Sequence, residues 1–141
     1  MIRYLLETGP LSAYLQGRKA VVELITPWIR RNEVATSILV YAEVTEYLKG
    51  FADFPIRHTQ LRRLLRYIYP YFLTYHILER YADIRRILRR PHGHGLIGDI
   101  DTLIAAAALE RKLTVVTFDT DFKRVPNLKI KLLPRPTRDN R

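Results

Sequence analysis

The chain has 141 residues, with 24 lysines and arginines against 14 aspartates and glutamates, and it contains no cysteine. Disulfides and cysteine-ligated zinc or iron are therefore excluded, and the apolar run near the N-terminus is too short for a signal peptide or a membrane span, so we expect a cytoplasmic protein. The basic excess favours a polyanionic partner, either nucleic acid or an acidic protein segment, although arginines also form solvated helix faces.

Short apolar segments with strand character alternate with helical patterns along the chain. In chain order we predict a strand at 2–6, a helical turn or two at 11–15, a helix at 20–31, a strand at 34–38, helices at 39–50 and 56–69, a brief strand at 71–75, helices at 76–90 and 99–112, and strands at 113–118 and 128–133. Pro27 should kink or shorten its helix. This alternation is typical of an α/β fold with a mainly parallel sheet, in which sites gather at the carboxyl ends of the strands.

The length predicts a single domain over residues 1–133, followed by a flexible tail at 134–141. Apolar stripes at helical spacing predict which helix residues point inward. On the helix at 39–50 these are Val40, Val44, Tyr47 and Leu48.

Four carboxylates interrupt the apolar patterns. Glu7 ends the first strand and Asp119 directly follows the strand at 113–118, whereas Glu43 and Asp101 lie in the inward stripes of two helices. A parallel sheet would bring these positions to one edge. Clustered carboxylates raise each other's pKa unless a cation lies between them, and Mg²⁺ or Mn²⁺ prefers oxygen ligands. A carboxylate-held metal beside basic groups can activate water against a phosphodiester.

Each acid also has a structural interpretation. Asp99 and Asp101 fall in the first turn of a helix, where carboxylates are favoured, and for Asp99 capping is the preferred interpretation. Glu43 could be a surface residue, and Glu46 competes with it for a role in the site. Asp121 can cap its turn, or it can support the metal ligands without binding the metal itself.

Histidines and tyrosines give weaker signals. His92 and His94 in PHGHG have ligand-like spacing, but ordinary exposure is favoured, with a contact to RNA phosphate left open. The nine tyrosines could stack on bases, but at helical or strand spacing such residues more often lie in the core or at a dimer interface, and the core is the preferred interpretation. They include Tyr67, Tyr69, Tyr71 and Tyr75.

Three blocks, taken in order, are more specific than any single residue: YLLETGPL, ATSILVYAEVTEYLKG and IGDIDTLIAAAALERKLTVVTFDTDFKRVPNLKI. Over about residues 2–133 the chain resembles PIN-domain proteins, and among them the VapC-type toxins of prokaryotic toxin–antitoxin pairs. The resemblance implies a three-layer α/β/α domain with a mainly parallel sheet. It also implies an Mg²⁺- or Mn²⁺-dependent ribonuclease that cuts transfer or ribosomal RNA and blocks translation, a VapB-type antitoxin as partner, and a homodimer.

The resemblance assigns residues by position. Glu7, Glu43, Asp101 and Asp119 match the catalytic acids, and all of these except Glu43 are expected to bind the metal. Supporting roles fall to Thr8 and Thr117, which match the hydroxyl residues that accompany the first and last acids, and to Asp99 and Asp121. The RNA-contact candidates are Arg85, Arg86, Arg89 and Arg90.

One position departs from the family pattern, which has aspartate where this chain has Glu7. The extra methylene displaces the carboxylate by ~1 Å, which the strict geometry of Mg²⁺ tolerates poorly and which can cost ~10²-fold in rate. The alternative function is therefore a weak or inactive module that binds RNA or its antitoxin without turnover. A second rival is an α/β protein whose acids only cap helices and whose arginines are only solvated.

Overall fold

A central five-stranded sheet organises the chain in a computed structural model, which describes residues 1–135. The elements in chain order are β1 (Tyr4–Leu6), α1 (Thr8–Leu15), α2 (Lys19–Arg30), β2 (Val34–Ser37), α3 (Ile38–Leu48), α4 (Phe54–Leu64), β3 (Tyr69–Tyr71), α5 (Tyr75–Leu88), α6 (Asp99–Arg111), β4 (Thr114–Thr117), the 3₁₀ helix η1 (Thr120–Arg124) and β5 (Ile130–Leu132). The strand order is β3-β2-β1-β4-β5, and every pairing is parallel.

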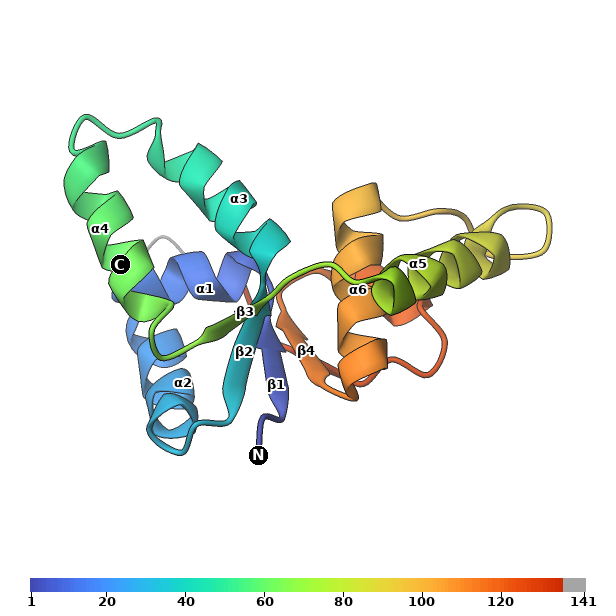
Figure 1. Cartoon of the computed structure of the whole chain (residues 1–141), viewed down its shortest axis with the longest axis horizontal. Coiled ribbons are helices and arrows are strands. Elements are labelled where there is room, and N and C mark those ends of the chain that lie inside the picture. The colour runs from blue at the N-terminus through green and yellow to red at the C-terminus, as the bar shows by residue number, and fades with distance from the viewer. Residues whose placement is uncertain (136–141) are drawn as a thin grey trace.

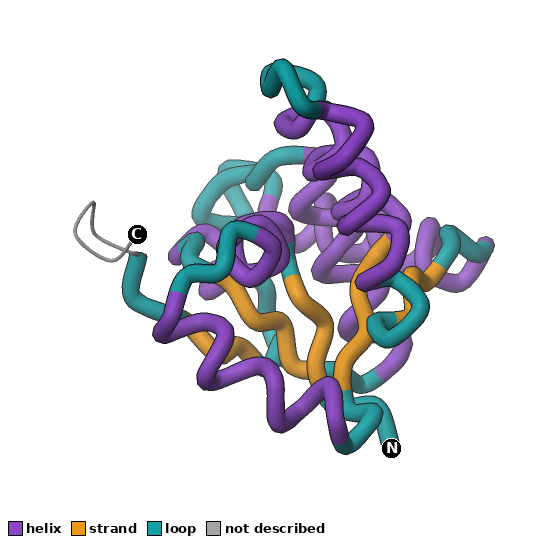
Figure 2. The backbone as a smooth tube through the Cα atoms, turned by 90° about the vertical axis from the view of Figure 1, so that its left-hand side faces the viewer, coloured by secondary structure: helices purple, strands orange, loops and turns teal. Residues whose placement is uncertain are grey.

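Helices cover both faces of this sheet. In Figure 1, α1 to α4 lie on one side of the strands and α5 and α6 lie on the other. Figure 2 shows the strands side by side among the helices. The predicted α/β class, with its three-layer α/β/α arrangement and parallel sheet, is confirmed.

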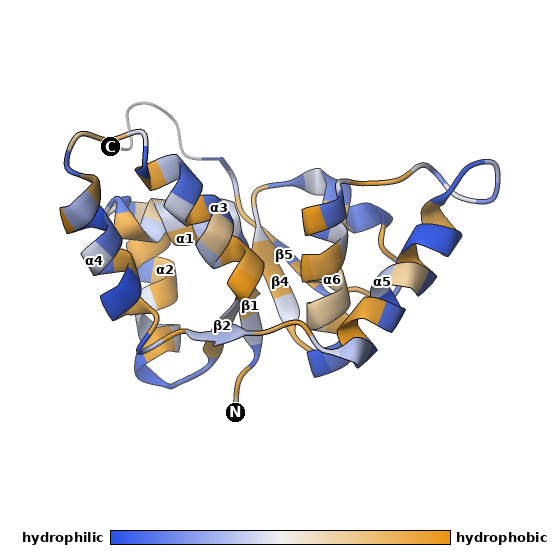
Figure 3. Cartoon of the chain, turned by 45° about the horizontal axis from the view of Figure 1, so that its top comes forward, coloured by the Kyte–Doolittle hydropathy of each residue, from blue (hydrophilic) through white to orange (hydrophobic). Residues whose placement is uncertain are grey.

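The core lies along the central strands. Leu5 and Leu6 of β1 are fully buried, as are Val115 and Val116 of β4. The neighbouring helix α6 presents four consecutive buried alanines, Ala105 to Ala108. Their small side chains let α6 lie close against the sheet, and the orange segments of β4 and α6 face each other in Figure 3. This rigid centre fixes where the strands end.

The structure differs from the predicted elements around β3, at the start of α1 and at Pro27 of α2. The brief strand predicted at 71–75 is β3 at Tyr69–Tyr71, because helix α4 ends at Leu64 rather than at residue 69. Helix α1 begins at Thr8, so Pro10 lies in its first turn, where a missing N–H costs no helical hydrogen bond. The predicted shortening at Pro27 was wrong, since α2 continues to Arg30.

Several tyrosines are more exposed than predicted. Tyr67, Tyr69 and Tyr75 are 66%, 54% and 85% exposed, so the core interpretation was wrong for these three, while Tyr71 is half-buried. They lie on the edge strand β3 or in the segments at its ends, where no further strand covers them. Tyr47 is also 47% exposed, because it lies at the margin of the apolar stripe of α3.

An aromatic stack joins β1 to α2. The rings of Tyr4 and Trp28 lie 3.9 Å apart between centroids and are nearly parallel, at 12°. We expect Tyr4→Leu to lower the free energy of unfolding by about 1 kcal/mol, because the stack is lost while apolar burial is largely kept. Urea unfolding measures this change. Tyr75→Leu is the matched control, and an equal loss in that exposed position would contradict the assignment to stacking.

The two ends of the chain add little to this description. The predicted domain over residues 1–133 stays a prediction, and most of the predicted tail, residues 136–141, lies outside the described residues. Among residues 1–135, no helix combines the length and the apolar character needed to cross a membrane.

Candidate functional site

The carboxyl ends of three neighbouring strands meet at one edge of the sheet. β1 pairs in parallel with β2 and β4, with Leu6 opposite Thr36 on one side and Val116 on the other. Glu7 follows β1 directly, and α3 starts immediately after β2 and carries Glu43. Figure 1 shows α3 and α6 on opposite sides of these strand ends.

Glu7 is half-buried and its carboxylate is held by two donors. Its Oε2 accepts a hydrogen bond from the Gly9 N–H at 3.3 Å, which caps helix α1, and another from the Thr117 hydroxyl at 3.1 Å. The pKa of Glu7 is raised to about 7, mainly by burial and also by the negative charges of Asp101 and Glu43, while the two hydrogen-bond donors act in the opposite direction. At neutral pH this carboxyl is therefore partly protonated.

Gly9 allows this close arrangement. A Cβ at position 9 would lie 2.7 Å from Cδ2 of Phe118, so any larger residue would require that ring to move. The glycine therefore brings the start of α1 against the segment that follows β4, which carries Asp119.

Two threonines support the acids, and each donates its hydroxyl hydrogen to an acid other than the one it was predicted to accompany. The Thr8 hydroxyl donates to Oε1 of Glu43 at 2.5 Å, whereas the Thr117 hydroxyl donates to Glu7. Thr117 Oγ1 also accepts from the Asp119 N–H at 2.9 Å, and Asp119 Oδ1 accepts from the Asp121 N–H at 2.9 Å. Each threonine thus donates to an acid on a segment far away in sequence, which only the folded chain brings near.

Asp101 joins the acids from the other side, in the first turn of α6. It is half-buried, and its pKa is raised to about 6, mainly by burial and also by the charges of Asp119, Glu43 and Asp121. The predicted acids Glu43 and Asp119 therefore lie near enough to Asp101, and Glu43 and Asp101 near enough to Glu7, for their charges to disfavour the ionised forms of Asp101 and Glu7. That mutual repulsion is relieved by a cation.

The donors fit a hard divalent ion in their chemistry. They are carboxylate oxygens, half-buried, beside hydroxyls and with no sulfur ligand. Within residues 1–135, however, no three aspartate, glutamate or histidine side chains already converge closely enough to ligate one ion. Oε2 of Glu7 instead accepts from Gly9 and Thr117, so ion binding requires acid side chains of the site to move closer together.

The remaining acidic candidates lie at the margin. Asp99 does not cap α6, so that prediction was wrong: Gly98 is the cap residue, and no side chain caps the helix. The Asp99 carboxylate instead binds the Arg85 guanidinium at 2.7 Å and the Tyr81 hydroxyl at 2.9 Å. Asp121 pairs with Arg124 at 3.4 Å. Glu46, the competitor of Glu43, is exposed on α3.

The predicted RNA-contact arginines divide into two groups. Arg85 is engaged with Asp99, and Arg86 is exposed outside any pocket we describe. Arg89 and Arg90 line a surface pocket together with Arg124, which the sequence patterns did not single out. His92 and His94 are exposed, as expected. The one sequence signal for Arg124 is its position a few residues after Asp119 and Asp121.

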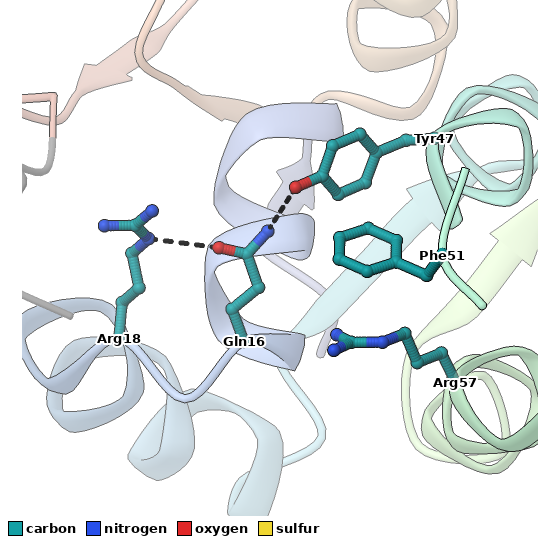
Figure 4. Close-up of a pocket in the computed structure, with 5 residues that line it drawn as sticks. All are labelled: Gln16, Arg18, Tyr47, Phe51 and Arg57. Carbon is teal, nitrogen blue, oxygen red and sulfur yellow. Dashed lines mark hydrogen bonds between the residues drawn. The ribbon is translucent and has the colours of Figure 1, made fainter. Parts of the chain in front are cut away.

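A second pocket, also missed from sequence, opens one helical turn beyond Glu43. It has a volume of about 350 Å³ and is lined by Gln16, Arg18, Tyr47, Phe51 and Arg57 (Figure 4). Gln16 Nε2 donates to the Tyr47 hydroxyl at 3.3 Å, and Arg18 Nε donates to Gln16 Oε1 at 3.2 Å. Its cationic side chains come from segments far apart in sequence, which no local pattern reveals.

Comparison with known proteins identifies the family. A family model of the PIN domain matches residues 4–128, so the chain belongs to the PIN-domain family. No curated protein matches the sequence. The PIN domains of VapC toxins are generally nucleases, and PIN nucleases generally use divalent metal ions.

Solved structures share this fold at low sequence identity. VapBC2 from Rickettsia felis, bound to a DNA fragment from its promoter, has 24% identity and a TM-score of 0.82, over 94% of this chain and 99% of that one. DNA-bound VapBC from Salmonella typhimurium has 18% identity and a TM-score of 0.82, over 93% and 98%. VapBC-5 from Mycobacterium tuberculosis, of the VapBC family of toxin–antitoxin systems, has 20% identity and a TM-score of 0.68, over 95% and 99%.

Proposed function

We propose that this protein is the toxin of a type II toxin–antitoxin pair and a metal-dependent endoribonuclease that hydrolyses phosphodiester bonds in RNA and thereby inhibits translation. The observation that carries the proposal is the set of four electrostatically linked carboxylates at the carboxyl edge of a PIN-domain sheet. These are Glu7, Glu43, Asp101 and Asp119.

The roles within the site follow from the contacts. Glu7, Asp101 and Asp119 would hold Mg²⁺ or Mn²⁺, and Thr8 keeps Glu43 oriented beside them. When bound, the divalent ion supplies charge neutralisation and lowers the pKa of water for attack on the phosphodiester. The protein's own groups position the ligands: Thr117 holds Glu7, and the backbone of η1 fixes the carboxylate of Asp119.

RNA is the proposed substrate because the site lies in a strongly basic chain, with a net charge of +10. Arginines supply phosphate contacts that need no particular base sequence. Transfer or ribosomal RNA would account for inhibition of translation. Cytoplasmic location, expected from the composition, belongs to the same proposal.

A VapB-type antitoxin is the proposed partner, supported by the structural similarity to VapBC complexes. A homodimer is the proposed oligomer. Its support is the group of exposed aromatic and apolar side chains around the edge strand β3. They are Tyr67, Tyr69, Phe72, Leu73, Tyr75 and Leu78.

The second candidate function is an RNA- or antitoxin-binding module without turnover. The observation that favours it is the state of Glu7, whose carboxylate caps α1 and whose pKa is raised to about 7 by burial. A protonated carboxyl is a poor metal ligand, because metal binding requires the charged form.

The test is RNA cleavage by the purified chain in Mg²⁺, Mn²⁺ or EDTA, with Asp101→Asn as the control for contaminating nuclease. The proposed function predicts cleavage that requires the metal and that disappears in Asp101→Asn. Cleavage that persists in EDTA, or in Asp101→Asn, would contradict the site. RNA binding without any cleavage would favour the binding module.

A further inference from the structure

A basic pocket lies on the connection between α5 and α6, beside the acidic edge but separate from it. Its volume is about 440 Å³. The residues that line it are Arg89, Arg90, His94, Gly95, Leu96 and Arg124. Three of the six carry a guanidinium, and no carboxylate lines the pocket.

The loop that forms the pocket is held in shape by its own backbone. The Gly93 N–H donates to the Arg89 carbonyl at 2.9 Å and the Gly95 N–H donates to the Leu88 carbonyl at 2.8 Å, so the chain turns back over the end of α5. A Cβ at Gly93 would lie 2.2 Å from the Ile87 carbonyl oxygen, and Gly95 has φ +116°, so both turns require glycine. The arginines at the end of α5 are thus presented by a defined turn, whose tip is hydrophilic in Figure 3.

Arg90 and Arg124 connect this loop to the site. One guanidinium nitrogen of Arg90 donates to the His94 carbonyl at 3.1 Å, which folds the arginine along the loop. Arg124 donates to the Leu96 carbonyl at 3.3 Å and pairs with Asp121 at 3.4 Å. Asp121 in turn lies close enough to Asp101 for its charge to act there. Arg124 and Asp121 therefore link the pocket to the acidic edge.

Arg89 and Arg90 also keep their charge uncompensated. Within residues 1–135 neither forms an ion pair with a carboxylate, in contrast to Arg80 and Arg85 on the preceding helix α5, which pair with Glu110 and Asp99. Planar guanidinium groups suit the oxygens of a phosphate because they donate two parallel hydrogen bonds. An acidic peptide would need apolar contacts as well, and Leu96 is the one large apolar residue lining the pocket.

We infer that this pocket binds a backbone phosphate of the RNA strand that is cut at the acids, through Arg89, Arg90 and Arg124. The inference rests on the proposed ribonuclease function for the identity of the strand. It adds a defined phosphate subsite, so that the strand is held by the cations while the acids act on a phosphodiester elsewhere along it. Arg85, whose guanidinium binds Asp99 at 2.7 Å, does not line this pocket.

The test is binding of a fluorescein-labelled single-stranded RNA oligonucleotide of mixed sequence to the full chain in EDTA, so that no cleavage intervenes. The variants are Arg89→Gln, Arg90→Gln and Arg124→Gln, and the matched control is Arg86→Gln, an exposed arginine of α5 outside the pocket. Each pocket variant should weaken binding roughly tenfold, and the control less than about twofold. The triple variant should reduce the slope of log K against log salt concentration by about 2.

Folding effects are separated by Arg89→Gln, because the Arg89 side chain makes no hydrogen bond within residues 1–135. Equal weakening in Arg86→Gln, or unchanged binding in the pocket variants, would overturn the inference. The inference would also be overturned if the pocket variants still bound RNA but no longer bound a polyglutamate peptide of similar length, since the ligand would then be an acidic protein segment. Pocket-dependent RNA binding by a chain that never cleaves would support the subsite while contradicting the ribonuclease proposal.

Discussion

Glu7→Asp is expected to raise metal-dependent RNA cleavage about 10²-fold, the rate factor that ~1 Å of misplacement can cost. In the present chain the longer side chain reaches the Gly9 N–H and the Thr117 hydroxyl, and its carboxyl has a pKa raised to about 7 by burial. Aspartate also caps helices well, so α1 should be preserved. Initial cleavage rates at saturating Mg²⁺ or Mn²⁺ measure the gain.

The control for this experiment is Glu46→Asp, which removes the same methylene from an exposed glutamate on α3. A second control combines Glu7→Asp with Asp101→Asn, which should return the rate to background. An unchanged or lower rate in Glu7→Asp would show that the glutamate is well placed, and that the metal geometry inferred from the family pattern does not apply to this chain.

Glu7→Gln is expected to stabilise the metal-free protein at pH 8 by on the order of 2 kcal/mol, because a half-buried charge next to Asp101 and Glu43 is removed. The pH dependence has a definite sign. Below the unfolded value of 4.5, Glu7 is neutral in both states and costs nothing; between 4.5 and about 7 the unfolded chain loses its proton first, so stability falls as pH rises. Above about 7 the full cost is present.

Urea unfolding in EDTA at pH 4 and pH 8 measures this difference, with Glu46→Gln as the matched control on the exposed face of α3. When the measurement is repeated at pH 8 with Mg²⁺, the parent chain should become more stable than Glu7→Gln. The parent chain then gains about 2.7 kcal/mol when the metal is at 100 times its dissociation constant, and Glu7→Gln gains little. Equal gains in the free energy of unfolding of both proteins on adding Mg²⁺ would show that Glu7 does not bind the metal.

The pKa of Asp101 is also raised, to about 6, by burial and by neighbouring negative charges, so the ionised form of Asp101 also lowers the stability of the folded chain. Both acids are therefore held in a strained electrostatic state that weakens the folded chain and favours a cation. A site arranged for binding or catalysis commonly costs stability in this way, because its charged groups are placed for a ligand and not for each other.

Much of the fold could be predicted because its signals are local. Apolar runs in β1, β2 and β4 and the alternation with amphipathic helices determined the α/β class and the parallel sheet. Glu7 and Asp119 were found as acids because each follows such a run directly. Boundaries near β3 were less well predicted, since a short edge strand with exposed tyrosines has little hydrophobic pattern to mark its limits.

The hydrogen-bond partners of the two threonines were determined only by the tertiary structure. The sequence placed Thr8 beside Glu7 and Thr117 beside Asp119, yet in the folded chain Thr8 donates to Glu43 and Thr117 donates to Glu7. The parallel order β2-β1-β4 brings those residues together from positions 35 and 110 apart in the chain. Arg124 of η1 likewise lines one pocket with Arg89 and Arg90, which lie more than 30 residues earlier in the chain. Local pattern determines which residues form strands and helices, whereas hydrogen bonds and charge coupling depend on distances that only long-range packing sets.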